Sequence, residues 1–303
     1  MSFKRKIMVI LLAVGILPAL ILAAILTWVS AQAISQSVFD HLSSVRSAKA
    51  STVTHYLETL AHEVEILAQS PDVNDALETF AETFYNLPEI DDSAVDTALT
   101  GYYQGQFLPR WQAQNTAVGA QDASRLMTQL SPQARYYQYQ YITQNPHPVG
   151  QKDKLRADAS DSAYSAQHRR FHPYMREVQQ RFGFYDIFLI DQQGTVVYSV
   201  FKELDFATNL NTGPYQDSGL ARAYQQGLAQ PAKGVAVTDF SLYVPSYDAP
   251  AGFISSPIFQ DGERVGVLVA QFPIDELNAV MKERDGLGET GETYLVGPDN
   301  LMR

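Results

Sequence analysis

An uninterrupted apolar segment lies close to the start of the chain. Residues 7–30, IMVILLAVGILPALILAAILTWVS, contain no charged side chain. At about 1.5 Å rise per residue, a helix of that length crosses a hydrocarbon core of roughly 30 Å. The basic residues from Lys4 to Lys6 predict that residues 1–6 lie in the cytoplasm. We therefore expect a transmembrane helix over residues 7–30.

A cleaved signal peptide is the alternative interpretation of this segment. Ala31-Gln32-Ala33 fits the small-x-small cleavage pattern. However, the apolar cores of signal peptides are usually roughly 7–15 residues long, and helical patterning continues through the would-be cleavage point. In both interpretations the rest of the chain is exported from the cytoplasm.

A second helical pattern follows the apolar segment directly. Residues 31–69 contain neither proline nor glycine, and apolar side chains recur at spacings of three and four residues. Lys49 interrupts this stripe, and Ser70-Pro71 ends it. So long an amphipathic helix needs a partner along its length, either the folded domain or a second copy of itself. We expect a homodimer through this helix, because the stripe is too long for one small domain to cover. The stripe consists of Val38, Leu42, Val45, Val53, Tyr56, Leu60, Val64 and Leu67.

Residues 31–181 are predicted to be helical throughout most of their length. A second helix should begin at Ser70-Pro71-Asp72 and end near Tyr85. Further helices are expected over about Val95–Leu130 and over Ser162–Arg181, where Pro173 should mark a kink or a restart. The tyrosines of RYYQYQYITQNPHPVGQK are more typical of core positions than of a binding site.

The pattern changes to strands in residues 182–273. YDIFLIDQQGTVVYSV contains two β-rich runs around Asp191-Gln192-Gln193-Gly194, a hairpin connection. A short helix is expected over about Ser218–Gln226. The fold class is therefore α+β, with a PAS-like five-stranded antiparallel sheet and helices on one face. The remaining strands are expected near Val235–Asp239, Gly252–Phe259 and Arg264–Phe272, followed by a helix from Ile274.

Composition narrows the function classes. The net charge of −11 argues against nucleic-acid binding by the bulk of the chain, because an acidic surface repels phosphate backbones. The absence of cysteine excludes disulfides, thiolate nucleophiles and cysteine metal sites, and suits a bacterial envelope compartment. His168 and His172 have a spacing that can bind a metal, but a solvated basic helix face is the favoured interpretation. No catalytic motif, metal site or cofactor is expected within these residues.

Several stretches together resemble the double Cache sensor region of bacterial methyl-accepting chemotaxis proteins. They are YDIFLIDQQGTVVYSV, KELDFATNL, DFSLYVPSYDAPAGFISSPIF, VGVLVAQFPIDELN and GLGETGETYLVGPDNLMR, preceded by a membrane anchor and a long helix. The resemblance implies a membrane-distal Cache module over residues 182–273. It also implies that residues 274–303 hold a linker helix and the start of a truncated second module, with strands at Thr293–Val296 and from Leu301.

The resemblance implies a ligand-sensing receptor in the bacterial inner membrane, with most of the chain in the periplasm. Small-molecule binding would be relayed across the membrane to cytoplasmic signalling proteins through a region beyond Arg303. The sensor of a membrane histidine kinase or nucleotide cyclase is an alternative. A membrane-tethered solute-binding protein without an output domain is another, from a different class.

The family's ligand pocket lies between the sheet and the segments that cover it. Family members that bind amino acids carry an Arg and a Trp for the carboxylate and an Asp on the last strand for the ammonium group. In this chain Gln271 occupies that strand position, and both tryptophans lie outside the module, so an amino acid is not the expected ligand. A carboxylate facing Lys202 is one option. The candidate ligand-binding residues are Tyr198, Lys202, Asp205, Tyr215, Asp239, Tyr243, Tyr247, Ser255 and Gln271.

Overall fold

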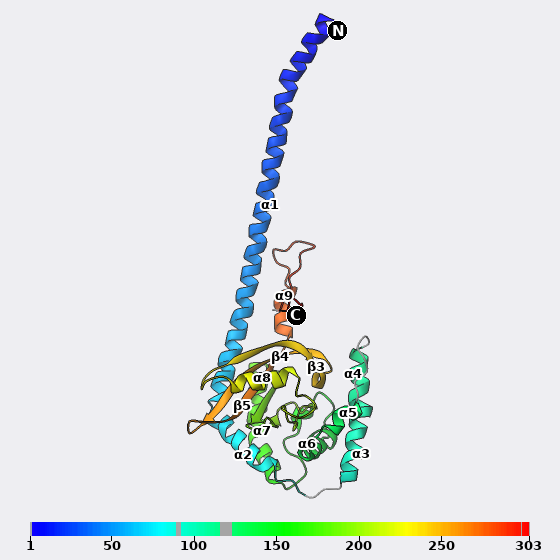
Figure 1. Cartoon of the computed structure of the whole chain (residues 1–303), viewed down its shortest axis with the longest axis vertical. Helices are drawn as coiled ribbons and strands as arrows, with labels where there is room; N and C mark the ends of the chain where they lie inside the picture. Colours follow the sequence, from blue (N-terminus) through cyan, green and yellow to red (C-terminus); the bar gives the residue numbers. More distant parts are fainter. Residues whose placement is uncertain (1, 89–91, 116–122, 298, 303) are drawn as a thin grey trace. The chain divides into compact units, whose positions relative to one another are not determined.

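A computed structural model describes residues 2–88, 92–115, 123–297 and 299–302. The chain forms two compact units, residues 1–54 with 279–295 and residues 55–278 with 296–303. Helix α1 (Phe3–Ala68) has residues in both units and is continuous, with Pro18 inside it (Figure 1). It is long and apolar enough to cross a membrane, with a mean hydropathy of 3.0 in its best 18-residue window. The two predicted N-terminal helices are therefore a single element.

The apolar stripe of α1 is only partly exposed. Leu60, Val64 and Leu67 are 4%, 0% and 5% exposed, because the unit that contains the sheet covers them. Ile34 and Val38, by contrast, are 65% and 52% exposed. The folded part of the chain therefore covers the C-terminal part of the stripe, and the expected homodimer stays a prediction.

Lys49 has a defined role in the unit formed by residues 1–54 and 279–295. Its Nζ donates to the carbonyl oxygens of Val280 and Glu283, both at 2.6 Å. These carbonyls belong to the C-terminal end of α9 (Asp275–Lys282) and the residue after it. The last carbonyls of a helix lack intrahelical donors and carry partial negative charge, so a cation stabilises them. This bond explains the charged residue within an apolar stripe.

The helical region contains more breaks than the sequence predicts. The predicted helix over Val95–Leu130 is divided, and residues 116–122 of it lie outside the described chain. Pro173 lies inside one undivided helix rather than at a restart. The elements are α2 (Pro71–Phe84), α3 (Asp92–Tyr102), π-helix η1 (Tyr103–Phe107), α4 (Leu108–Gln114), α5 (Ala123–Thr128), α6 (Pro132–Gln138), π-helix η2 (Tyr139–Thr143), 3-10 turn η3 (Lys152–Lys154) and α7 (Ala163–Phe182).

Five antiparallel strands form one sheet in the order β2-β1-β5-β4-β3, which confirms the predicted α+β fold class. Gly194 has φ of 85° in the β1–β2 connection, as the predicted turn requires. The strands are β1 (Asp186–Asp191), β2 (Val196–Ser199), β3 (Ala236–Tyr243), β4 (Ala249–Gln260) and β5 (Glu263–Phe272). Helix α8 (Gly219–Leu228) precedes β3, and 3-10 turn η4 (Val244–Ser246) follows it.

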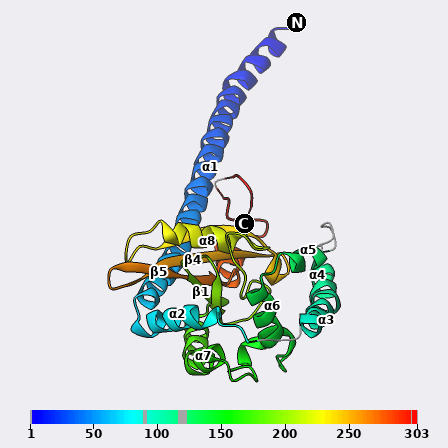
Figure 2. The same ribbon diagram turned by 60° about the horizontal axis from the view of Figure 1, so that its bottom comes forward.

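Helices cover both faces of this sheet, which corrects the prediction of one covered face. A Cβ at Gly266 would meet the Leu77 side chain of α2 at 2.7 Å. The side chain of the next residue, Val267, lies 2.6 Å from the position of a Cβ on Gly227 of α8. Consecutive strand residues point to opposite faces, so α2 and α8 lie on opposite sides (Figure 2). The sequence pattern could not show this, because β1 is buried at every position.

The face toward α2 and α7 is closed by aromatic packing. Phe80 stacks on Tyr198 with ring centroids 4.8 Å apart, and Tyr164 lies 5.1 Å from Phe80. His168 and His172 are 0% and 2% exposed and stack at 4.4 Å, so the predicted solvated histidine face is wrong. Aromatic pairs of this kind each contribute about 0.5–1.5 kcal/mol beyond burial. This face therefore serves as core.

The C-terminal residues form less strand than predicted. Val296 and Met302 make a single antiparallel bridge, and Gly297 N donates to the carbonyl of Leu301 at 2.9 Å. No strand is assigned over Thr293–Val296 in the described residues. A single bridged pair is too little pairing to hold two strands in water.

Candidate functional site

Buried polar residues gather on the α8 face of the sheet, near the end of β5. Asp186 of β1 and Gln271 of β5 are direct cross-strand partners, so their side chains project from the same face. The segment after β2 brings Lys202, Glu203 and Asp205 to the same region. Both strand residues are at least 96% buried, with exposures of 1% and 4%. These two strand residues therefore project from the side opposite the aromatic core.

Asp186 is a buried carboxylate of the cluster. Its Oδ1 accepts three backbone N–H bonds, from Ile187 at 2.7 Å and from Val200 and Phe201 at 2.9 Å each. Its Oδ2 is buried and has no hydrogen-bond partner. Burial, together with the nearby charge of Asp205, raises the pKa of Asp186 to about 8, against the effect of the N–H bonds. One carboxylate oxygen thus remains free to bind another group.

Asp205 shows the same division between its two oxygens. Tyr243 donates its hydroxyl to Oδ2, whereas Oδ1 has no partner. Burial raises the pKa of Asp205 to about 6, and the bond from Tyr243 opposes that rise. The buried hydroxyl of Tyr215 also has no partner. Asp205 and Tyr215 are 0% and 3% exposed, so water in bulk does not satisfy these atoms.

Glu203 is the third carboxylate and is fully hydrogen-bonded. Tyr185 donates to Oε1 at 2.8 Å, and Ser246 donates to Oε2 at 2.9 Å. The side-chain amide of Gln271 donates to Ser246 Oγ at 3.4 Å, which links Glu203 to β5. Burial and then the charge of Asp205 raise the pKa of Glu203 well above its ordinary value. Each oxygen of Glu203 therefore already has a donor, and Glu203 holds Tyr185 and Ser246 in position.

Lys202 is the cation of the cluster, and its amine is already engaged. The residue has φ of 60°, and Nζ donates to the carbonyl of Ser199. Nζ lies 4.4 Å from the ring centroid of Tyr198 and 4.8 Å from that of Phe206. Burial lowers the pKa of Lys202 to about 7, although Asp186 and other carboxylates oppose this. The amine faces aromatic rings of the core side, so a carboxylate ligand would have to compete for it.

Gln138 braces the segment that carries Asp205. Its amide donates to the carbonyls of Leu204 at 2.8 Å and Phe206 at 3.0 Å. Its Oε1 accepts the hydroxyl of Tyr103 at 2.8 Å. All three hydrogen bonds of this brace are buried, so helix α6 and π-helix η1 fix the position of the cluster from outside the sheet.

A narrow crevice leads to the cluster. Its volume is about 10 Å³, room for about one water molecule, and Lys202 and Glu203 form part of its wall. Tyr247 at its rim stacks on Phe107 with ring centroids 5.3 Å apart. Tyr247 and Asp248 both have positive φ, and Trp111 Nε1 donates to Asp248 Oδ2 at 2.6 Å. Helix α4 therefore holds the strained turn that closes the crevice.

The structure brings together most of the predicted ligand residues but not all of them. Lys202, Asp205, Tyr215, Tyr243 and Gln271 belong to the cluster described above. Tyr247 lies at the crevice rim, and buried Ser255 lies beside α8, with a hydroxyl 3.1 Å from a Cβ on Gly227. Tyr198 packs on the opposite face, where its hydroxyl bonds to His172 Nδ1 at 2.7 Å, and Asp239 is exposed on β3.

Two cluster members, Asp186 and Glu203, were not among the predicted ligand residues. Asp186 begins the apolar run DIFLID, and a carboxylate at the start of a buried strand is a usable signal. The family resemblance points to an acid on the last strand only, and this chain has Gln271 at that position. The acid lies directly across from it on β1.

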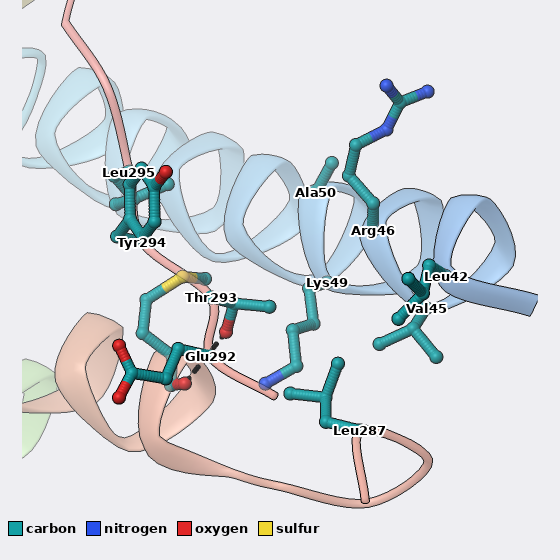
Figure 3. Close-up of a pocket in the computed structure, with 11 residues that line it drawn as sticks. Leu42, Val45, Arg46, Lys49, Ala50, Leu287, Glu292, Thr293, Tyr294 and Leu295 are labelled. Carbon is teal, nitrogen blue, oxygen red and sulfur yellow. Dashed lines mark hydrogen bonds between the residues drawn. The ribbon is translucent and has the colours of Figure 1, made fainter. Parts of the chain in front are cut away.

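A second cavity lies within the unit formed by residues 1–54 and 279–295 (Figure 3). Its volume is about 360 Å³, and its walls are mainly apolar, with Leu42, Val45 and Leu287 among them. Lys49 points into it, and Arg46 points away. Among the described residues that line it, none has a buried polar atom without a partner. The cluster on the sheet is therefore the better candidate for specific recognition.

No metal site is found in the described part of the chain. The described residues contain no group of three or more His, Asp or Glu side chains that could hold an ion. Both ring nitrogens of His172 have partners, Tyr198 OH and the Asp153 carbonyl at 2.6 Å. His172 is thus structural in its bonding, whereas His168 bonds only through Nδ1, to the carbonyl of Arg156 at 2.8 Å, and its Nε2 has no partner.

The chain is similar to several solved sensor domains. The Vibrio cholerae histidine kinase DctB sensor domain is 19% identical over 60% of this chain and 61% of that chain, with a TM-score of 0.32. The Campylobacter jejuni chemoreceptor Tlp3 sensory domain with isoleucine bound is 15% identical over 71% and 74%, with a TM-score of 0.33. The Pseudomonas fluorescens chemoreceptor CtaA domain with L-serine is 14% identical over 68% and 66%, with a TM-score of 0.32.

No protein-family model matches the sequence, and no curated protein matches it. The match spans about three fifths of the DctB sensor-domain chain. With TM-scores near 0.3, the function and ligand have to be argued from the residues of this chain.

Replacing Asp186 by Asn should stabilise the protein, and more so at higher pH. Since the folded-state pKa of Asp186 is raised to about 8, wild-type stability is retained at acid pH and lost as the pH rises toward 8. Asn keeps an oxygen for the three N–H bonds and removes the buried charge. We expect a gain of roughly 1–3 kcal/mol at pH 8 and a smaller one at pH 5. Thermal unfolding of the variant and the wild type at pH 5 and at pH 8 measures this gain in stability.

The matched control for this prediction is Asp261→Asn, which changes the same charge on an exposed turn residue. It should alter stability by less than about 0.5 kcal/mol at either pH. A loss of stability in Asp186→Asn that grows with pH would contradict the predicted sign.

Proposed function

We propose that this chain is the ligand-sensing, extracytoplasmic part of a membrane-anchored receptor. The observation that carries the proposal is the cluster of buried acceptor atoms without partners on the α8 face of the sheet, namely Asp186 Oδ2, Asp205 Oδ1 and Gln271 Oε1, with the hydroxyl of Tyr215. A chemoreceptor of the methyl-accepting type is the form of receptor that the sequence resemblance favours. The sensor of a histidine kinase is the nearest alternative.

The energetic cost of the cluster supports a binding role. Leaving a buried polar atom without a partner costs about 1–3 kcal/mol, and more for a charged group. Native proteins satisfy the great majority of such atoms, so several on one face need a reason. Perturbed carboxylates beside a crevice are also typical of functional sites. A ligand that supplies the bonds would recover this free energy on binding.

A route for the signal is also present in the chain. Helix α1 is continuous from its apolar segment to Leu67, and its side chains at Leu60, Val64 and Leu67 are buried in the unit that contains the sheet. A ligand that binds two arrangements of the sheet unit with different affinity shifts their populations. We propose that α1 passes this shift through the membrane to a cytoplasmic output domain, which the resemblance places beyond Arg303.

Cysteine labelling would test the proposed membrane topology, because the chain has no native cysteine. Lys154 is exposed and belongs to the proposed extracytoplasmic part, and Lys4 belongs to the proposed cytoplasmic end. A membrane-impermeant maleimide should label Lys154→Cys in intact spheroplasts. It should label Lys4→Cys only after the membrane is disrupted. The reverse pattern would contradict the topology.

We also propose that α1 pairs with a second copy of itself near the membrane. Ile34, Val38 and Leu42 lie on one face and are 65%, 52% and 44% exposed. Oxidation of the full chain in membranes should cross-link Val38→Cys. Gln36→Cys is the control, since two residues rotate the side chain by about 200° around the helix. Equal cross-linking of both variants, or of neither, would argue against this seam.

A binding screen would test the sensing function itself. The full chain in nanodiscs is heated with a panel of cationic, anionic, zwitterionic and neutral metabolites. At a hundredfold excess over Kd, a ligand should stabilise the folded state by about 2.7 kcal/mol. Tyr215→Phe should weaken the effect of a hit, whereas Tyr174→Phe, at an exposed tyrosine, should not. If no compound in the panel stabilises the chain, the sensing proposal fails.

A further inference from the structure

A further cavity lies at the end of β1 that is remote from the cluster. Its volume is about 470 Å³, within the range of roughly 300–1,000 Å³ that is usual for small-molecule sites. Four segments form its walls: the end of α2 with Tyr85, the start of α6, the β1–β2 turn and the segment after β2. Asp191, which bonds to Tyr85, is five residues further along β1 than Asp186, a separation of about 17 Å at about 3.4 Å per residue. The cavity is therefore separate from the cluster to which we assign sensing.

Tyr85 presents an aromatic ring to this cavity in a fixed orientation. Its hydroxyl donates to Asp191 Oδ2 at 2.7 Å and lies 3.0 Å from Thr195 Oγ1, which can donate in return. The ring of Phe84 packs edge-on against the ring of Tyr85, with centroids 5.3 Å apart. Tyr85 is nevertheless 44% exposed. A large ring that is held in place and left partly exposed offers a flat apolar face to a ligand.

The polar side chains around Tyr85 are uncharged amides and hydroxyls. None of the described residues that line the cavity carries a charged side chain. Asn209 Nδ2 donates to Thr195 Oγ1 at 3.1 Å, so this part of the wall is already bonded. Gln133 and Gln193 line the cavity with side-chain amides that have no hydrogen-bond partner in the described chain. Each of these amides offers two N–H donors and one acceptor oxygen to a ligand.

The one carboxylate close to this wall does not offer its charge to the cavity. Asp191 is 1% exposed, and its Oδ1 accepts from the backbone N–H groups of Gln193 at 3.0 Å and Thr195 at 2.8 Å. Its Oδ2 is occupied by the hydroxyl of Tyr85. An ion that left water for this cavity would therefore lose solvation without gaining a counter-charge. The wall favours an uncharged ligand.

We propose that this cavity binds a neutral saccharide, with one face of a sugar ring stacked on Tyr85 and its hydroxyls bonded to Gln133 and Gln193. A sugar ring has C–H bonds across its face and hydroxyls around its edge, and each hydroxyl can both donate and accept. The fixed aromatic face matches the first feature, and the two free amides match the second. This second site goes beyond the proposed sensing function, because no residue of the cluster lines it.

Three uncharged compounds test the ligand class: cellobiose, N,N′-diacetylchitobiose and sorbitol. The full chain in nanodiscs is titrated with each one, and binding is followed by saturation-transfer NMR. At least one disaccharide should bind with a Kd on the order of 1 mM or below, with the strongest saturation at the C–H protons of one ring face. Sorbitol has hydroxyls but no ring face, and it should bind at least about tenfold more weakly.

The two disaccharides also distinguish the source of the ligand. They share the same linkage, and only diacetylchitobiose carries the N-acetyl groups of a structural glycan strand. Tighter binding of diacetylchitobiose would support a glycan strand as the ligand of this site. Tighter binding of cellobiose would support a free sugar.

Four variants locate the binding. Gln133→Ala and Gln193→Ala should each raise the Kd of the bound disaccharide about three- to tenfold, because each removes hydrogen bonds to the ligand. Gln180→Ala is the matched control at an exposed glutamine of α7, and it should leave the Kd unchanged. Tyr85→Ala should abolish binding together with the ring-face saturation. If Tyr85→Ala does not fold, the two glutamine variants still decide.

The outcomes separate this site from the sensing function. The assignment would be overturned if neither disaccharide bound, if sorbitol bound equally well, or if both glutamine variants bound the disaccharide as tightly as the wild type. Those results would leave the sensing function in place, because it rests on the metabolite panel and on Tyr215→Phe. That variant should bind the disaccharide normally. Loss of disaccharide binding in Tyr215→Phe would place the sugar in the cluster and overturn the separate site.

Discussion

Burial of the Asp186 carboxylate is the constraint on which the rest of the site depends. A carboxyl group at the start of a buried strand needs hydrogen-bond donors, and three backbone N–H groups offset part of the cost of its burial. Two of those groups belong to Val200 and Phe201, so the chain after β2 must turn across the end of β1. That turn carries Lys202, Glu203 and Asp205 into the same small volume. The geometry of one oxygen atom thereby fixes the residues around it.

The two faces of the sheet differ in what fills them. On the α2 face, stacked rings such as Phe80 and Tyr198 fill the space, and His172 is paired at both ring nitrogens, although His168 Nε2 and Tyr141 OH have no partner. On the α8 face, carboxylate and amide oxygens lack partners. Proteins often tolerate such local costs where function requires them, provided that the rest of the fold is stable. The aromatic core is well placed to supply that stability, because it lies directly behind the same strands.

The sequence predicted the elements that depend on local pattern. The apolar segment, the hairpin at Gly194 and the five strands follow from charge-free length, turn chemistry and β-rich runs. Pattern could not show that helices cover both faces, since β1 is apolar at its inner positions on both sides. It also failed for His168 and His172, whose burial depends on α2 and Tyr141 rather than on neighbours in sequence.

The site was predictable only in part, for a similar reason. Lys202, Asp205 and Tyr243 could be named because they lie in one covering segment or at the end of a strand. Asp186 could not, because its importance arises from pairing with Gln271, about 85 residues away along the chain, and strand register is a tertiary property. Glu203 is similar, since its partners Tyr185 and Ser246 come from different elements.

The narrowness of the crevice has a consequence for association kinetics. With room for about one water molecule, it admits nothing larger until the turn at Tyr247 and Asp248 moves away from α4. Any molecule that reaches the buried cluster must wait for that opening. Its on-rate therefore falls below the roughly 10⁵–10⁷ M⁻¹s⁻¹ that is usual for unhindered encounters. At high concentration the observed rate should level off at the rate of opening. The helix that pins the turn, and not diffusion, then sets how quickly the chain can respond.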